Sequence, residues 1–304
     1  QRTGLTFSSG KNGDISILKS LKNTHPIDLI REIRSFPIQK YDLVLSDFEP
    51  VSAWSALLSG VPCIELSHQA AVVHPLAPKP KERAAFGRYV LQHYTPSKHK
   101  YGFHFKSYDA RVFTPVIRHE IRDAQPTDQG HYTVYLPGYH DDILMHFLRQ
   151  FDVKWEVFSK HATYAYRVDN VFIEPISQLR FQQSLISATG VLCGAGFELP
   201  SEALFLGKKT MVIPMKGHYE QTCNALGASD VGATTIPELD LIFHRQINYW
   251  LGQPQQAPLL FPNQTEQILI DILNAFQKEG RAAFEPGVEF ETLRQKLGLL
   301  RYFF

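Results

Sequence analysis

Short apolar runs alternate with segments of helical character along most of the chain. In the first half, residues 41–46 and 61–66 are apolar runs of strand length, as is typical of buried parallel strands. The segment 52–58 between them combines apolar and helix-forming residues, and Gly60 is placed to end it. A strand, a helix and a second strand in this order predict a βαβ unit, and ligands usually bind at the strand ends of such units.

The same alternation continues at a regular spacing over the second half. Further strands are predicted at 131–136, 153–158, 171–176, 191–193 and 210–213. Further helices are predicted at 83–93, 141–151, 181–188, 200–206, 219–228 and 265–278. Regular alternation of strands and helices predicts an α/β fold built on doubly wound parallel sheets.

The pattern is interrupted between residues 113 and 130. Pro115 and a charged run at 118–123 lead there into a stretch of proline, glycine and polar residues at 126–130. With 304 residues, the chain is long enough for two domains of ordinary size. We therefore predict a first domain at 1–122, a second domain at 123–285 and a tail at 286–304.

Composition and charge narrow the range of functions. Hydrophobic residues make up 44% and charged residues 20% of the chain, which is typical of a globular protein. The formal net charge of +1 lacks the basic excess of most nucleic-acid-binding domains, so we expect no nucleic-acid partner. The three cysteines are too few and too far apart for a disulfide framework, and they fit a reducing, cytoplasmic compartment. Each lies in an apolar stretch, where burial is the ordinary state of a cysteine.

The most informative stretch is G-A-G-F-E-L-P-S-E at 194–202, which begins where a predicted strand ends. Its glycines allow the backbone to approach a ligand closely, and Pro200 suits the first turn of the following helix. Free backbone N–H groups at that helix start, together with the helix dipole, bind a diphosphate without a metal ion. Glu202 would then lie in the first turn, where its carboxylate is able to accept hydrogen bonds from both hydroxyls of a ribose. The alternative is that Glu202 only complements the helix dipole.

A second stretch of the same kind follows one βα unit later. Residues 214–225 read P-M-K-G-H-Y-E-Q-T-C-N-A, so a strand again leads through a glycine-bearing loop into a helix with polar first turns. The side chains there that are able to bind sugar hydroxyls are His218, Glu220, Gln221 and Asn224. Helix capping and a solvated face are the alternative interpretation. The two stretches in tandem are much more specific than either one alone.

The sequence from Gly194 to Asn224 resembles the donor-site region of glycosyltransferases with the GT-B fold. It is most similar to the group of the bacterial enzyme that adds N-acetylglucosamine to the lipid-linked peptidoglycan precursor (family 28-like), and there to a poorly characterised bacterial and archaeal branch. In the first half, D-L-V-L-S-D-F-E-P at 42–50, G-V-P-C-I at 60–64 and S-H-Q-A at 67–70 agree with this resemblance. The resemblance covers about residues 40–230, and its second-half motif is the more specific.

The resemblance implies two Rossmann-like domains that face each other across a cleft. The C-terminal domain would bind a nucleoside-diphosphate sugar, with UDP as the favoured nucleotide. The enzyme would transfer a hexose or N-acetylhexosamine from this donor to a lipid-linked or glycan acceptor. Because such an acceptor lies at the membrane, we expect a cytoplasmic protein that contacts the inner face of the membrane peripherally.

The resemblance also implies which residues bind the donor. The expected donor-binding residues are Gly138, Gly194, Gly196, Phe197, Ser201, Glu202, His218, Glu220, Gln221 and Asn224. The loop 194–201 would hold the diphosphate and Glu202 the ribose. Glu220 and Gln221 would hold the sugar, and Gly138, ahead of its helix, would contact the diphosphate or the base.

We expect no metal ion, and no cofactor besides the sugar donor as substrate. The chain has no D-x-D motif, the metal-binding signature of the other large glycosyltransferase fold. Asp47-Phe48-Glu49 comes near to it, but it lies in the wrong half for a donor site. The histidines are not arranged as H-E-x-x-H, so a zinc site is not predicted either.

The N-terminal part departs from the family pattern. Family members begin with a strand and a G-x-G-H loop whose histidine is a candidate general base, and no such motif precedes Gly4. We therefore expect that one or two βα units, at about 30 residues per βαβ unit, are missing from this sequence. The candidates left for the base are Asp47, Glu49 and His68, because deprotonating a hydroxyl requires a carboxylate or an imidazole. For His68, a structural role is the competing interpretation.

Two other functions compete with glycosyl transfer. A nucleotide-sugar 2-epimerase of the same fold would present similar donor residues, and it would release free UDP and a mixed pair of epimers without an acceptor. A non-catalytic nucleotide-sugar-binding protein would keep the nucleotide pocket and lack the N-terminal base. A longer gene product that carries the G-x-G-H loop would exclude that third function.

Overall fold

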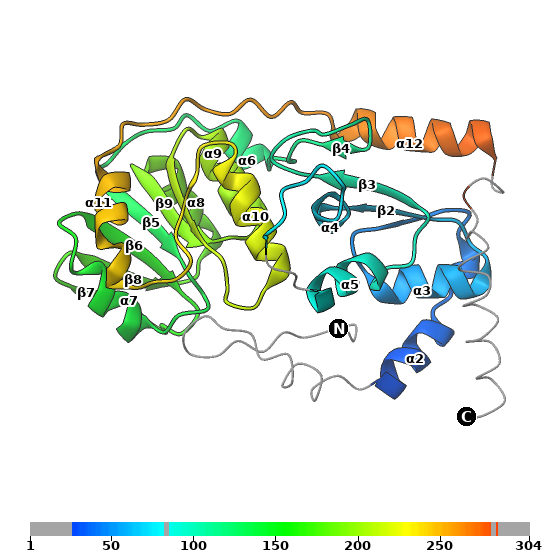
Figure 1. The fold of residues 1–304 in the computed structure, drawn as a ribbon, viewed down its shortest axis with the longest axis horizontal. Coiled ribbons are helices and arrows are strands. Elements are labelled where there is room, and N and C mark those ends of the chain that lie inside the picture. The colour runs from blue at the N-terminus through cyan, green and yellow to red at the C-terminus, as the bar shows by residue number, and fades with distance from the viewer. Residues whose placement is uncertain (1–25, 82–84, 281–283, 285–304) are drawn as a thin grey trace.

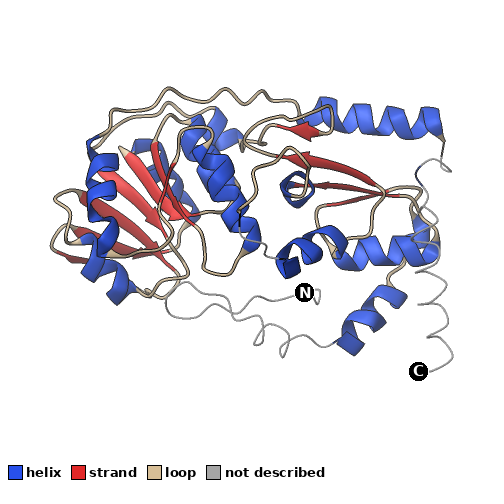
Figure 2. Cartoon of the chain, viewed as in Figure 1, coloured by secondary structure: helices blue, strands red, loops and turns tan. Residues whose placement is uncertain are grey.

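The computed structural model describes residues 26–81, 85–280 and 284 of the chain. These residues form two α/β units side by side, each built on its own sheet of mainly parallel strands (Figure 1, Figure 2). The predicted α/β class with parallel sheets is thus confirmed. The predicted tail at 286–304 and the βα units expected before the present N-terminus lie outside the described residues.

The first sheet has four parallel strands that lie side by side in chain order. The strands are β1 (Val44–Ser46), β2 (Cys63–Ser67), β3 (His99–Phe103) and β4 (Val112–Phe113). The helices of this part are α2 (Pro26–Ser35), the 3-10 turn η1 (Ile38–Lys40), α3 (Pro50–Ser59), α4 (His68–Val72) and α5 (Ala85–His93). The predicted βαβ unit is formed by β1, α3 and β2. Gly60 ends α3 with a φ of 67°, in the left-handed region that favours glycine.

Strands β3 and β4 were not predicted, because neither is an apolar run. Strand β3 starts with His99 and Lys100, and β4 is two residues long. Gly102 of β3 packs directly on α4, since an added Cβ would lie 2.5 Å from the backbone nitrogen of Ala71. The strand is therefore stabilised by close packing against a neighbouring helix, which periodicity alone does not reveal.

The second sheet has seven strands in the order β11-β10-β9-β5-β6-β8-β7, and β7 is the antiparallel one. The strands are β5 (His131–Tyr135), β6 (Lys154–Ser159), β7 (Tyr166–Val168), β8 (Val171–Pro175), β9 (Gly190–Gly194), β10 (Lys209–Ile213) and β11 (Thr234–Thr235). The helices that follow β4 along the chain are α6 (His119–Arg122), α7 (Asp141–Leu148), α8 (Gln178–Ser187), α9 (Glu198–Phe205), α10 (Tyr219–Ser229), η2 (Leu241–Phe243), α11 (His244–Gly252) and α12 (Thr265–Glu279). The five strands predicted here all appear, whereas the short edge strands β7 and β11 were not predicted.

Successive residues along a strand of the second sheet point alternately into two separate hydrophobic cores, one on each face of the sheet. Leu192 of β9 packs in one cluster with Phe147 of α7 and Trp250 of α11. Its neighbours Val191 and Cys193 pack in the other cluster, with residues of α8, α9 and α10. Helices therefore cover both faces of this sheet, which explains why its central strands are continuous apolar runs in the sequence.

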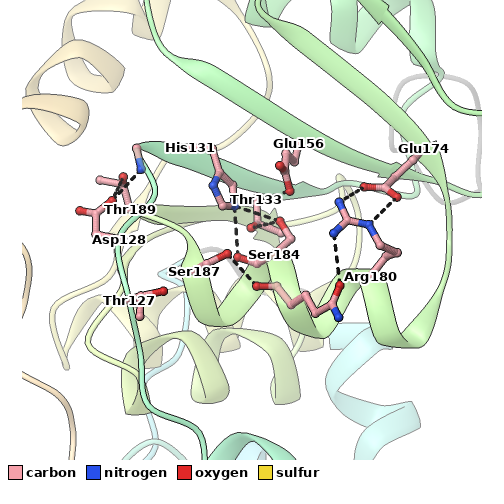
Figure 3. A network of polar contacts seen from close by, with 12 residues as sticks. Thr127, Asp128, His131, Thr133, Glu156, Glu174, Arg180, Ser184, Ser187 and Thr189 are labelled. Carbon is pink, nitrogen blue, oxygen red and sulfur yellow. Dashed lines mark hydrogen bonds and ion pairs between the residues drawn. The ribbon is translucent and has the colours of Figure 1, made fainter.

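A buried polar network fixes α8 against the second sheet (Figure 3). The Ser184 hydroxyl lies 2.7 Å from Thr133 Oγ1 and 3.2 Å from His131 Nε2. All three residues are buried, so the hydrogen bonds offset the loss of their contacts with water. Because α8 leads directly into β9, this network also fixes the strand that carries the glycine loop.

After α11 the chain returns to the first unit, and α12 packs there. Ile268 and Ile272 of α12 share a buried cluster with Ile64 of β2, and Figure 1 shows α12 alongside β3 and β4. This helix falls within 123–285, the range predicted for the second domain, yet it covers the first sheet. An apolar stripe on a helix predicts burial, but it does not specify which sheet the helix covers.

Among the described residues, every helix is too short or too polar to span a lipid bilayer.

Candidate functional site

A cleft of about 550 Å³ lies between the two units, at the carboxyl ends of the strands of both sheets. Asp47 and His68 line it directly after β1 and β2, and Phe103 lines it at the end of β3. From the second unit, Tyr135 ends β5 and Gly194 ends β9. Parallel sheets usually bind ligands at this edge, so the cleft is the candidate site.

The predicted site residues divide into those that line the cleft and those that do not. The first group is Asp47, His68, Gly194, Gly196, Phe197, Glu220 and Gln221. The second group is Glu49, Gly138, Ser201, Glu202, His218 and Asn224. Gly138 lies in the turn between β5 and α7, beside Pro137, which does line the cleft.

Helix α9 begins at the cleft, directly after the loop that contains Gly194 and Gly196. Neither glycine has a positive φ. A Cβ on Gly196 would meet no atom of the described residues within 4 Å, and a Cβ on Gly194 would approach the Ile213 carbonyl oxygen at 4.0 Å. Neither backbone conformation nor internal packing therefore requires glycine here, and the space beside both residues is open to a ligand.

Glu202 lies in the second turn of α9, because the helix begins at Glu198 and not near Pro200 as predicted. Its side chain is 6% exposed, and its two oxygens accept hydrogen bonds from Arg118 Nε at 2.6 Å and Arg118 Nη2 at 2.8 Å. Arg118 belongs to the connection between the two units, so this ion pair ties α9 to the connection. The first-turn carboxylate is Glu198, which lines the cleft.

Ser201 faces into α9 and not into the cleft. Its hydroxyl donates to the carbonyl oxygen of Phe197 at 2.7 Å, and the residue is 1% exposed. The contact runs from one turn of the helix to the previous one, so the Ser201 side chain is engaged within the helix.

Helix α10 also begins at the cleft, and its first residues contact both units. His218 caps the helix, because its Nδ1 accepts a hydrogen bond from the Gln221 backbone N–H at 3.4 Å. Gln221 Oε1 accepts from the Met215 backbone N–H at 2.8 Å, which closes the preceding loop. Glu220 accepts from Gln69 Nε2 of the first unit at 3.4 Å, and burial raises the pKa of Glu220.

His68 joins the two units and is held on all sides. Its Nδ1 lies 2.7 Å from the Phe103 carbonyl oxygen, its Nε2 lies 2.8 Å from Asn224 Oδ1, and its ring stacks on Phe197 at 3.8 Å. Asn224 is fixed in turn, because its Nδ2 donates to the Ala195 carbonyl oxygen at 3.2 Å. Burial lowers the pKa of His68 to about 4. Both ring nitrogens lie against oxygen atoms of the protein, and a neutral imidazole donates to one of them, so the structure favours the structural interpretation of His68 over its role as a base.

Asp47 and Glu49 lie close in sequence but differ in position. Asp47 lines the cleft and is accessible to solvent. Desolvation at the cleft wall raises its pKa, and the nearby carboxylates of Glu198 and Glu65 raise it further. Glu49 instead caps α3, because its two oxygens accept from the backbone N–H groups of the next helical residues at 2.9 and 2.7 Å. Of the two carboxylates predicted as bases, Asp47 is the one that the structure brings to the cleft.

Two charged residues were not predicted: Glu198, which lines the cleft, and Arg118, which holds Glu202. Glu198 was missed because Pro200 was taken as the first helical residue, although proline fits any position of a first turn. Arg118 was seen as part of a charged connection, and its partner Glu202 is 84 residues away. Among residues 26–81, 85–280 and 284, no three His, Cys, Asp or Glu side chains gather as a candidate metal site.

Comparison with solved structures finds the same fold in glycosyltransferases. Acinetobacter baumannii MurG is similar over 90% of this chain and 84% of its own, with a TM-score of 0.50 and 16% identity. Spinosyn rhamnosyltransferase SpnG is similar over 75% of this chain and 69% of its own, with a TM-score of 0.49 and 14% identity. Glycosyltransferase VinC, solved in complex with DTDP, is similar over 76% and 68%, with a TM-score of 0.45 and 13% identity. At 16% identity the likeness to MurG concerns the fold alone, which is of the GT-B type.

Comparison of the sequence with protein families gives a match over most of the chain. No curated protein matches this sequence. The profile of the family described as Glycosyl transferase family 1 matches residues 17–251. Because this match covers well over half of the 304 residues, the protein belongs to glycosyl transferase family 1.

Proposed function

We propose that this protein transfers a hexose or N-acetylhexosamine from a nucleoside-diphosphate sugar, with UDP as the favoured nucleotide, to a hydroxyl of a lipid-linked or glycan acceptor. We also propose that the protein is related to the peptidoglycan-precursor group of glycosyltransferases and that its reaction requires no metal ion. The proposal also places the protein in the cytoplasm, with a peripheral contact at the inner face of the membrane.

One observation carries the proposal. Gly194 and Gly196 border open space at the amino end of α9, and nothing within the described protein requires glycine at either position. Free backbone N–H groups and the positive end of the helix dipole face the same space. A diphosphate matches this arrangement, because its oxygens accept hydrogen bonds and its charge is attracted by the dipole.

The neighbouring residues support the assignment of the rest of the donor. Glu202 would bind the ribose hydroxyls with the lone pairs that Arg118 leaves open. Because its side chain is 6% exposed and lies outside the cleft lining, this binding requires the start of α9 to open toward the donor. Glu220 and Gln221 line the cleft at the start of α10, where their oxygens and amide are able to bind sugar hydroxyls. The predicted roles of His218 and Asn224 would be indirect, since they hold α10 and His68 in place.

Asp47 is our candidate for the general base. Its carboxylate would take the proton from an acceptor hydroxyl, and the hydroxyl oxygen would form a bond to the anomeric carbon of the sugar. The bond between that carbon and the diphosphate oxygen would break, and the N–H groups at the start of α9 would stabilise the charge that develops on the leaving diphosphate. The raised pKa of Asp47 makes it a stronger base than an ordinary aspartate.

A thermal-shift screen tests the donor assignment. The wild-type protein would be measured with UDP, GDP, dTDP and their sugars, beside the variants Glu202→Ala and Glu156→Ala. Glu156 is a control because it pairs with His131 and does not line the cleft. We expect UDP to raise the melting temperature of the wild type and of Glu156→Ala, and not that of Glu202→Ala. A nucleotide shift that persists fully in Glu202→Ala would contradict the ribose assignment.

The products of a turnover test separate glycosyl transfer from the other two functions. UDP-N-acetylglucosamine would be incubated with the protein, with and without a membrane lipid extract. Release of UDP that increases with the extract supports transfer. A mixture of epimers without any extract would support a 2-epimerase, and binding without UDP release would support a non-catalytic protein.

A further inference from the structure

Phe48 has a backbone conformation that a bulky side chain rarely adopts. Within the described residues, Phe48 and Asp169 are the non-glycine residues with positive φ, at 51° and 53°. Asp169 lies in the short turn between β7 and β8, where Val168 pairs with Val171 and aspartate suits the left-handed region. Phe48 has no such local reason, because its side chain makes no turn hydrogen bond and is bulky.

The strained residue is part of a tight turn that leads from β1 into α3. The buried Ser46 hydroxyl donates to the Glu49 carbonyl oxygen at 3.1 Å and lies 3.2 Å from the Glu49 backbone nitrogen. Glu49 then caps α3 with its carboxylate. Both ends of the turn are thus fixed, and the two residues between them are Asp47 and Phe48.

The Phe48 ring is anchored away from the cleft lining. Its centroid lies 5.1 Å from that of Tyr94, and the ring packs on a buried cluster of Val72, Leu91 and Cys223. Val72 belongs to α4, Leu91 to α5 and Cys223 to α10. The cluster therefore joins the first unit to the helix of the second unit that begins at the donor side of the cleft.

We infer that Phe48 is a positioning residue for Asp47: the anchored ring holds the turn in its left-handed conformation and thereby keeps the Asp47 carboxylate in the cleft. The inference rests on the proposed function, in which Asp47 is the base. Strained backbone persists where the surrounding structure imposes it, and it is concentrated at functional sites. Here the imposing structure is the cluster around Phe48, and the residue that it serves is the neighbouring aspartate.

Two substitutions of Phe48 separate the effect of its ring from the effect of its backbone conformation. Phe48→Gly adopts the positive φ without strain but removes the anchor, so the two residues between the fixed ends of the turn are free to move and Asp47 leaves the cleft. Phe48→Tyr keeps the anchor. Leu91→Ala is the matched control, because it removes packing from the same cluster without touching the turn. Asp169→Gly is the control for relief of positive φ at a position outside the cleft lining.

The first readout is the pKa of the Asp47 carboxyl, measured by NMR on protein with 13C-labelled aspartate and assigned with Asp47→Asn. In the wild type, desolvation at the cleft raises this pKa, and the nearby carboxylate of Glu198 raises it further. We expect Phe48→Gly to lower the pKa of Asp47 toward the ordinary range of an exposed aspartate, whereas Phe48→Tyr, Leu91→Ala and Asp169→Gly keep it raised. An unchanged pKa in Phe48→Gly, or an equal shift in Leu91→Ala, would overturn the inference.

The second readout is the kcat of UDP release from UDP-N-acetylglucosamine, measured across a range of pH. We expect Phe48→Gly to lower kcat by about tenfold or more, with the affinity for UDP unchanged, since a general base acts on the chemical step. If Phe48→Gly does not fold, Tyr94→Leu removes the ring on which Phe48 rests and is tested in its place. Absence of any UDP binding or release in the wild type would refute the proposed function, and the NMR titration would still decide the role of Phe48.

Discussion

Removal of the Arg118 side chain tests whether the connection between the two units is needed to hold Glu202. In Arg118→Ala, the Glu202 carboxylate loses both of its short hydrogen bonds to the guanidinium. The Glu202 side chain is 6% exposed, so its charge stays largely buried without a partner. An unpaired buried carboxylate destabilises the folded state because water no longer solvates it.

The size of the effect follows from the burial of the two partners. Breaking a fully buried ion pair costs about 3–5 kcal/mol. The Arg118 side chain is 45% exposed, so water enters the vacated space and reduces the penalty to about 2 kcal/mol. For a protein of 304 residues, that corresponds to a decrease in Tm of about 3 °C.

The assay is denaturant and thermal unfolding of Arg118→Ala beside a control variant, Arg149→Ala. Arg149 contacts Asp169 at 2.6 Å, but both side chains are exposed, so its removal should cost less than about 1 kcal/mol. Adding Glu202→Gln to Arg118→Ala should recover most of the lost stability, because no buried charge is then left. Equal losses in Arg118→Ala and Arg149→Ala, or no recovery in the double variant, would refute the reasoning.

Three further predictions follow from individual groups. Burial lowers the pKa of His104 to about 3, below its value in the unfolded chain. The free energy of unfolding of the wild type should therefore decrease as the pH falls below 6.5, by about 3 kcal/mol at pH 4. Unfolding curves of His104→Gln across pH 4–7 should show a smaller decrease. Burial lowers the pKa of Lys208 to about 8, so the free energy of unfolding should increase between pH 8 and 10.5, where the buried ammonium loses its charge. Lys208→Met should raise the Tm at pH 7 and leave the Tm unchanged at pH 10.5. Asp47→Asn should lower kcat for UDP release by about a hundredfold with unchanged UDP affinity, whereas the exposed neighbour Asp42→Asn should leave both unchanged.

The fold was predictable where buried strands are apolar runs. Strands β5, β9 and β10 have helices on both faces, so nearly every residue in them is apolar or buried and the pattern is clear. Strand β3 was missed because it contains His99 and Lys100, and because its stability depends on Gly102 packing against α4. Packing of this kind joins segments that are distant in sequence, and no local pattern reports it.

The part of the candidate site that is formed by glycines and by the first residues of helices could be predicted from the sequence. The loop of Gly194 and Gly196 lies at the cleft, as the motif indicated. The pairing of Arg118 with Glu202 was not predictable, because the two residues meet only in the folded chain. Glu49 lies outside the cleft lining for a local reason: it directly precedes Pro50, and a proline favours the first position of a helix, so Glu49 becomes the cap of α3.

The measurement that tests the central claim most directly is the calorimetric affinity for UDP of the wild type, Gly196→Ala and Gly252→Ala. Both glycines lack a positive φ, and a Cβ on either would meet no described atom within 4 Å, so neither substitution should disturb the fold. Gly196 lies in the cleft, whereas Gly252 ends α11 outside the cleft lining. If the loop holds the diphosphate, the added methyl of Gly196→Ala should weaken UDP binding by about tenfold, or about 1.4 kcal/mol, and Gly252→Ala should bind as the wild type does. Equal UDP affinity in all three proteins would contradict the account.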